Sequence, residues 1–184
     1  SKEGKVAKIE QITPVPRDGH LSSLFRLESI KLVVWISYEL TPHHNIHKTK
    51  LHTFSAHKKI IKEMELCTFF GLGGAAEIIK VEKVLQLNHS LQAENAPVTL
   101  CLAGQITHFS DSNSKLNQAF LLQISLSSSG AVRNVKKQIF EKYGSIVDLI
   151  QTEDSLICLT DRNIACLIKE SQDGHGFRLQ PVRG

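Results

Sequence analysis

The chain has 184 residues, 41% of them hydrophobic and 22% charged, and a net charge of +4 at pH 7. This composition excludes a disordered segment, and a chain of this length buries a core without disulfides or a structural metal. The positive charge is smaller than a dedicated nucleic-acid-binding domain normally carries, and no apolar run reaches the roughly 18 residues of a membrane span. The four cysteines form no CxxC pair and lie among apolar residues, which is typical of small buried side chains.

The first part of the chain is predicted to form strands. Lys5–Val15 alternates polar and apolar residues and ends at prolines, which is typical of an edge strand. Leu24–Glu28 and Ile30–Leu40 are rich in β-branched and aromatic residues, so two strands are expected there, with Trp35 in the core. The segment Thr41–Lys50 is polar and rich in histidine, and we expect a surface loop or a short helix.

A helix is predicted after Ser55, which is a suitable N-terminal cap. An apolar stripe at helical spacing supports this helix and consists of Ile60, Ile61, Met64 and Cys67. The run Gly71–Gly74 is expected to end it. For Ala75–Leu91 the spacing of apolar residues fits both a helix and a strand, and we favour a strand over Ile78–Leu87.

The second half is predicted to begin with a hairpin and to continue into another helix. Pro97–Phe109 and Asn117–Leu126 are strand-like, and Gly104 marks a bulge or bend in the first of them. Over Ala131–Tyr143 one face is apolar and the other basic, and Gly144 follows where a helix-ending glycine belongs. The apolar face consists of Val132, Val135, Ile139, Phe140 and Tyr143, and the opposite face of Arg133, Lys136, Lys137, Gln138 and Lys142.

The C-terminal part is predicted to consist of short strands. They span Ser145–Ile150, Leu156–Leu159 and Ile164–Ile168, and Phe177–Val182 is expected to be a last strand or a tail. The predicted fold class is therefore α+β, a mostly antiparallel β-sheet with two or three packed amphipathic helices. Residues 1–184 are expected to form a single mixed α/β domain, with a sub-boundary near 111–116 or 127–130 as the alternative.

Five histidines lie close together in the first half, at positions 43, 44, 47, 52 and 57. In a helix His43 and His47 would share a face at the spacing of a metal pair. Lysines are interleaved with them and no cysteine is near, so a solvated basic surface is favoured, with phosphate contact as the alternative.

The glycine run also fits the Gly-x-Gly-x-x-Ala pattern of dinucleotide-binding folds, at Gly71, Gly73 and Ala76. That pattern requires a preceding strand and a following helix. Because the preceding segment is predicted to be helical, a helix-ending turn is favoured.

Nucleophilic catalysis has weak support in this sequence. There is no Gly-x-Ser-x-Gly elbow, and the Cys–His pairs that can be drawn join Cys67 or Cys101 to His108 or His89. A thiol in an apolar strand is normally inert. No catalytic residue, cofactor or metal is therefore predicted.

Two segments resemble known domain families. The sequence IFEKYGSIVDLI, residues 139–150, resembles the helix-to-strand junction of ferredoxin-like and RNA-recognition domains, whose base-stacking aromatic residues are absent here. FSAHKKII, LAGQITHF and NQAFLLQ, within Phe54–Phe140, resemble segments of nuclear transport factor 2-like domains in the same order. Both resemblances imply a non-catalytic binding domain.

The function predicted from the sequence is that of a non-catalytic protein-interaction domain, a scaffold element of a larger cytoplasmic or nuclear assembly with no membrane contact. Ser1 in place of Met indicates an excised piece of a longer protein. The predicted interaction residues are Arg133, Lys136, Lys137, Lys142, Lys58 and Lys59, and an edge near Lys5–Val15 is the other candidate. The alternatives are a nucleic-acid-binding module using residues 43–62 and 133–142, and a nucleotide-dependent enzyme using Gly71–Gly74.

Overall fold

The structure is a computed structural model, and it describes residues 19–41, 46–55, 58–72, 77–87, 97–109, 115–172, 174 and 176–182. These residues form twelve β-strands, one short 3-10 helix and one short α-helix. In chain order the elements are β1 (Gly19–Leu27), η1 (Glu28–Ile30), β2 (Leu32–Leu40), β3 (Ile46–Ser55), β4 (Ile60–Glu65), α1 (Leu66–Phe70), β5 (Glu77–Leu87), β6 (Val98–Phe109), β7 (Lys115–Leu126), β8 (Val132–Phe140), β9 (Ile146–Gln151), β10 (Leu156–Thr160), β11 (Ala165–Glu170) and β12 (Phe177–Pro181). The predicted α+β class, and with it the mixed α/β description, is therefore wrong.

The strands form three antiparallel sheets of four strands each. Sheet A has the order β1-β2-β3-β4, sheet B the order β5-β6-β7-β8, and sheet C the order β12-β11-β10-β9. Every strand therefore pairs with its neighbour in the sequence, as in a meander. Within the described ranges, no helix has the length and hydropathy needed to cross a membrane.

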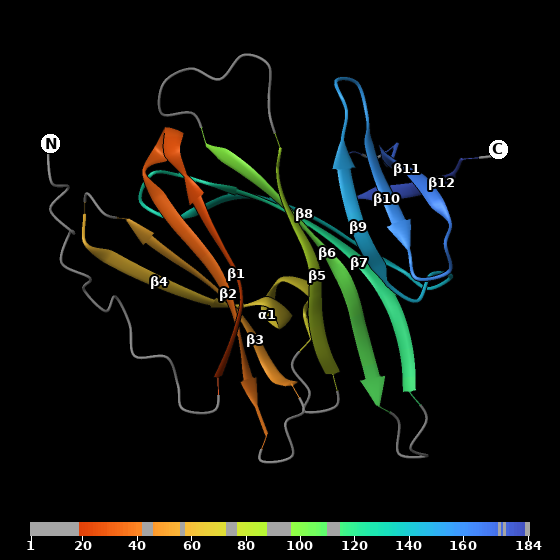
Figure 1. Cartoon of the computed structure of the whole chain (residues 1–184), viewed down its shortest axis with the longest axis horizontal. Helices are drawn as coiled ribbons and strands as arrows, with labels where there is room; N and C mark the ends of the chain where they lie inside the picture. The colour runs from red at the N-terminus through yellow and green to blue at the C-terminus, as the bar shows by residue number, and fades with distance from the viewer. Residues whose placement is uncertain are drawn as a thin grey trace, which may run out of the picture.

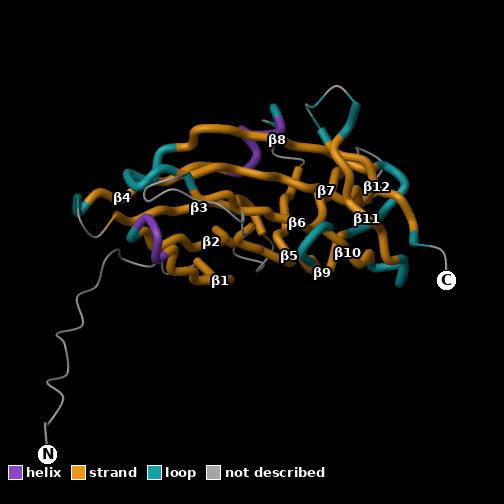
Figure 2. Tube along the Cα trace, turned by 90° about the horizontal axis from the view of Figure 1, so that it is seen from above, coloured by secondary structure: helices purple, strands orange, loops and turns teal. Residues whose placement is uncertain are grey.

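Sheet B lies between the other two sheets (Figure 1). In β6, Leu100 and Leu102 belong to the core shared with sheet A, whereas Cys101 and Ala103 belong to the core shared with sheet C. This alternation is the two-residue period of a strand that is buried on both faces. Figure 2 shows that β1, β5 and β9 lie along one side of the molecule and β4, β8 and β12 along the opposite side. The three sheets are thus stacked in the same sense.

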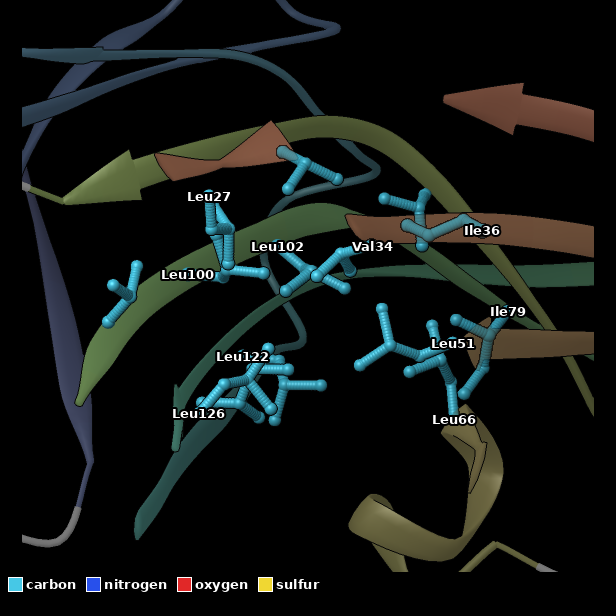
Figure 3. Close-up of a cluster of buried hydrophobic side chains, with 14 of the residues drawn as sticks. Leu27, Val34, Ile36, Leu51, Leu66, Ile79, Leu100, Leu102, Leu122 and Leu126 are labelled. Atoms are coloured by element: carbon cyan, nitrogen blue, oxygen red, sulfur yellow. The ribbon is translucent and has the colours of Figure 1, made fainter. Parts of the chain in front are cut away.

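The core between sheets A and B is aliphatic. Figure 3 shows Val34, Ile36 and Leu51 of sheet A among leucines of sheet B, with Leu66 of α1 beside them. Tyr38 is part of this core, and its hydroxyl donates to the carbonyl oxygen of Val81 at 2.9 Å. The hydroxyl therefore keeps a partner although its ring is buried.

Several strands are where the sequence predicts them. The predicted strands Ile30–Leu40, Ile78–Leu87, Pro97–Phe109 and Asn117–Leu126 correspond to β2, β5, β6 and β7, and the short C-terminal strands to β9–β12. In β5, Ile79 and Val81 are buried whereas Lys80 and Glu82 are exposed or half-buried, which is the predicted alternation. The predicted edge strand Lys5–Val15 lies outside the described residues.

The two predicted amphipathic helices are strands. The segment Ala131–Tyr143 contains β8, which pairs with β7 from Ala119↔Phe140 to Leu126↔Val132. The stripe predicted after Ser55 belongs mostly to β4, which pairs with β3, and only its end is helical, in α1. The junction that resembles a helix-to-strand junction is accordingly a strand, a turn and a strand.

Candidate interaction surfaces

The predicted basic residues lie on two different sheets. Arg133, Lys136 and Lys137 are on β8, the edge strand of sheet B, and Lys142 follows in the turn before β9. Lys58 and Lys59 form the exposed turn between β3 and β4 of sheet A. Three of the six therefore share strand β8, where Lys136 and Lys137 reach toward opposite faces of sheet B, and the role of all six in binding stays a prediction.

The lysines of β8 already have partners within the fold. The Nζ of Lys136 lies 2.7 Å from Oε1 of Glu170 in β11, and the Nζ of Lys137 donates to the carbonyl oxygen of Phe69 in α1. These contacts tie sheet B to sheet C and to α1. Lysines on an edge strand also hinder the addition of a further strand, so their arrangement is that of a protected edge.

Of the five clustered histidines, His52 is the one whose side chain is described; His43, His44, His57 and the side chain of His47 lie outside that description. The His52 ring stacks on Trp35, with ring centroids 4.9 Å apart and an interplanar angle of 3°. Trp35 is buried, as predicted. It lies on the outward face of sheet A, however, where the His52 ring stacks on it. No group of three or more metal-ligating side chains is found in the described part of the chain.

The outward face of sheet A carries a charged network around this stack. The Nζ of Lys50 lies 2.5 Å from Oε1 of Glu39 and 2.6 Å from Oε1 of Glu63. Hydrogen bonds to these two carboxylates hold the pKa of Lys50 above its ordinary value. The same Glu63 lies 3.7 Å from Nδ1 of His52, whose Nε2 is 2.7 Å from the hydroxyl of Ser37. Burial lowers the pKa of His52, so its ring is neutral at pH 7.

Ser37, His52 and Glu63 follow the order of a hydroxyl–imidazole–carboxylate triad, but they lie on an open sheet face. Ser37 and His52 belong to the two central strands, β2 and β3, which pair with neighbours on both sides. Their backbone N–H groups are used in the sheet, whereas acyl transfer needs donors aimed at a developing oxyanion. The arrangement is therefore suited to ordering this face rather than to catalysis.

Neither Cys67 nor Cys101 is paired with His108, and His89, the other histidine of the predicted Cys–His pairs, lies outside the described residues. Cys101 faces the core between sheets B and C, where Cys158 and Cys166 lie opposite each other on β10 and β11. Burial raises the pKa of Cys158 to about 12 and also raises that of Cys101. Cys101 and Cys158 therefore stay protonated, and all three buried thiols act as packing groups. The Nδ1 of His108 is instead 3.2 Å from a carboxylate oxygen of Glu77.

The start of the glycine run ends α1. Gly71 has φ +71°, and the N–H of Leu72 donates to the carbonyl oxygen of Cys67 at 3.1 Å, as in a helix-ending turn. A helix precedes this glycine and strand β5 follows the run, which is the reverse of the order that a dinucleotide-binding pattern needs. Gly73 and Gly74 lie outside the described residues.

The outward face of sheet C carries an apolar surface that the pairing of its strands produces. Two cross-strand rows form it, Ile150–Ile157–Leu167 and Leu159–Ala165, and we call these five residues the sheet C outer patch. Their neighbours along the strands, such as Leu149, Cys158 and Cys166, point into the core with sheet B. Ile150 is 56% exposed and Leu159 is 39% exposed. Sheet C is therefore apolar on both faces, although among the described residues only sheet B covers one of them.

The patch is not among the surfaces predicted from the sequence, although the sequence contains a signal for it. The runs LICL in β10 and ACLI in β11 contain no polar residue, whereas a strand with one solvated face normally alternates. Such runs are typical of strands that are covered on both faces. Comparison with protein-family models, with curated proteins and with solved structures finds no match for this chain.

Proposed function

We propose that this chain is a non-catalytic protein-interaction domain of a larger assembly and that the sheet C outer patch is its docking surface. The observation that carries the proposal is the group of five aliphatic side chains on an exposed sheet face, where the row Leu159–Ala165 meets its first charge at Asp148 of β9. Burial of apolar area on association contributes roughly 25 cal/mol per Å², so such a face favours a partner over water.

The contrast with sheet A supports this choice. The outward face of sheet A carries Lys50 between Glu39 and Glu63, as expected of a surface in contact with water. On sheet C the corner residue Asp148 is the nearest charge to the patch, and its Oδ1 lies 2.7 Å from the Nζ of Lys83 in sheet B. The basic residues of β8 are less suited to nucleic acid, because Lys136 and Lys137 are already bound within the fold.

A site-specific photocrosslinking experiment in cells tests the proposal. Replacing Leu159 by p-benzoylphenylalanine places the probe within the patch, and the same replacement at Leu116, which is 56% exposed on β7, is the matched control. We expect a discrete crosslinked protein from position 159 that is absent from position 116 and is lost when Ile157→Lys is added. Identical products from both positions would contradict the proposal.

A further inference from the structure

We propose that the sheet C outer patch binds a second copy of this chain, patch against patch, about a two-fold axis that runs along the strands of sheet C. This inference rests on the proposed function, since it names the occupant of the same surface. It follows from the residues of the patch and from the charges at one of its ends.

The patch is compatible with a copy of itself. A two-fold interface brings the same surface of both copies together, so a charged surface would face its own charge. The two rows carry five aliphatic side chains, and sheets packed face to face interdigitate such side chains. The core between sheets B and C shows that the other face of sheet C already packs in this way.

The end of the patch next to the β9–β10 turn has an acidic and a basic side. Glu153 and Asp154 are exposed in that turn, beside β9 and β10. Lys169 of β11 and Arg178 of β12 are exposed and directly opposite each other. The pairing of Leu156 with both Gln151 and Ile168 places the turn and Lys169 at the same end of the sheet.

A second copy would neutralise these charges. Like charges directly opposite each other on neighbouring strands are destabilising, so Lys169 and Arg178 gain from an acidic partner. A two-fold axis along the strands exchanges the two sides of the sheet while keeping its ends in place. Glu153 and Asp154 of each copy then face the basic pair of the other copy.

Stacking on sheet A of a second copy is less favourable. Stacking the sheet C outer patch on sheet A would cover Lys50, Glu39 and Glu63. Removing these charges from water costs free energy, and contacts with the apolar side chains of sheet C do not offset that cost. It would also join two different surfaces. Repeated contacts between different surfaces build open filaments unless the rotation from one copy to the next closes a ring. The patch-to-patch contact instead forms a closed dimer of two copies.

Sedimentation velocity over a range of concentrations from about 1 to about 100 µM tests the inference. We expect a reversible dimer, and Leu159→Lys should raise its dissociation constant about 100-fold, because it places two ammonium groups in an apolar interface. The control Leu116→Lys should leave the dimer unchanged, and so should Ile61→Lys, which lies on the outward side of sheet A. A dimer that is lost with Ile61→Lys but kept with Leu159→Lys would overturn the proposal.

Two variants with reversed charges test the direction of the proposed two-fold axis. The variant Glu153→Lys/Asp154→Lys is basic on both sides and Lys169→Glu/Arg178→Glu is acidic on both, so each alone should dimerise less than the unmodified chain. An equimolar mixture of the two should form a heterodimer. Failure of the mixture to associate would contradict the two-fold arrangement.

A chain that stays monomeric throughout the concentration range would overturn the second-copy proposal. The proposed function would still stand if position 159 gave a crosslink to a different protein. If position 159 gave no specific crosslink and the chain were monomeric, both proposals would be wrong.

Discussion

At Gly104 the backbones of β5 and β6 leave no room for a Cβ atom. The pairing register shifts there, since Val81 pairs with Gly104 and Lys83 with Ala103, which leaves Glu82 as the extra residue of a bulge. A Cβ atom at position 104 would overlap the carbonyl oxygen of Lys80. The bulge that the sequence led us to expect at Gly104 is therefore on the partner strand, and the glycine makes room for it.

We expect Gly104→Ala to lower the free energy of unfolding by about 3 kcal/mol, because backbone atoms of two strands must move apart to admit the methyl group. Gly71→Ala is the matched control, since it faces open space and has only the left-handed φ to disfavour it, at about 1 kcal/mol. Urea unfolding of the two variants measures both values. Equal losses would contradict the close approach at Gly104.

His52 gives the stability of sheet A a dependence on pH. Burial disfavours the imidazolium, so the pKa of His52 in the folded chain is below the ordinary value of 6.5. The unfolded chain then binds the proton first as the pH falls. The contribution of this residue to stability is present above about pH 6.5 and is lost as the pH falls toward the folded-state pKa.

His52→Gln should therefore reduce the change in unfolding free energy between about pH 7.5 and about pH 5.5, while lowering stability at the higher pH through loss of the stack on Trp35. The other histidines are the same in both chains, so the difference between the two chains isolates position 52. Urea unfolding at both pH values provides the measurement. The same pH dependence in the variant and the unmodified chain would contradict the role assigned to His52.

Strand β8 shows how far the sequence determines an element. Val132, Val135 and Ile139 recur at a spacing that fits one helical face, yet all three are β-branched and suit a strand equally well. Residue spacing alone cannot separate these cases in an edge strand, whose lysines place their charged ends in water while their stems cover apolar surface. The pairing with β7 decides the structure, and that pairing is a contact between separate segments.

Helix α1 has only five residues, and its place in the fold depends on packing. Leu66 is fully buried in the core between sheets A and B, and the ring of Phe70 lies edge-on to Phe120 with centroids 5.4 Å apart. A helix this short is unstable alone, so its buried side chains hold it.

Leu66→Ala should lower the free energy of unfolding by about 3 kcal/mol, through lost burial and the cavity it leaves. Leu116→Ala removes the same atoms from an exposed position and should cost less than about 0.5 kcal/mol. Denaturant unfolding of both variants measures the difference. A small loss of unfolding free energy in Leu66→Ala would show that α1 does not stabilise the core between sheets A and B.

At the scale of the whole molecule, β5, β6 and β7 of sheet B were predictable, whereas β8 and the stacking of the sheets were not. Alternation within β6 assigns its residues to two faces, but no single strand shows which sheet will cover each face. The same limit applies to the sheet C outer patch, because the apolar runs in β10 and β11 indicate two covered faces without naming what covers them. Three sheets of four strands, stacked in one sense, leave an outward face at each end of the stack (Figure 2). The outward face of sheet A carries the Lys50 network beside apolar residues such as Phe54 and Ile61, whereas the two rows of the sheet C outer patch are aliphatic, so the two ends of the stack differ chemically.

The buried thiols between sheets B and C report whether these layers separate independently. Cys101, Cys158 and Cys166 are at most 1% exposed, whereas Cys67 is half-buried within α1. Alkylation needs access, and burial together with the hydrogen bond to Glu65 raises the pKa of Cys67, so we expect maleimide to modify Cys67 slowly in the folded chain and the other three only after the sheets part. If sheets B and C form one cooperative unit, the three thiols should react together, with an opening free energy equal to that of global unfolding in urea. Mass spectrometry of peptides after timed labelling measures each rate. Reaction of these thiols at an opening free energy clearly below that of global unfolding would contradict a single cooperative unit. It would identify sheet C as a layer that detaches on its own.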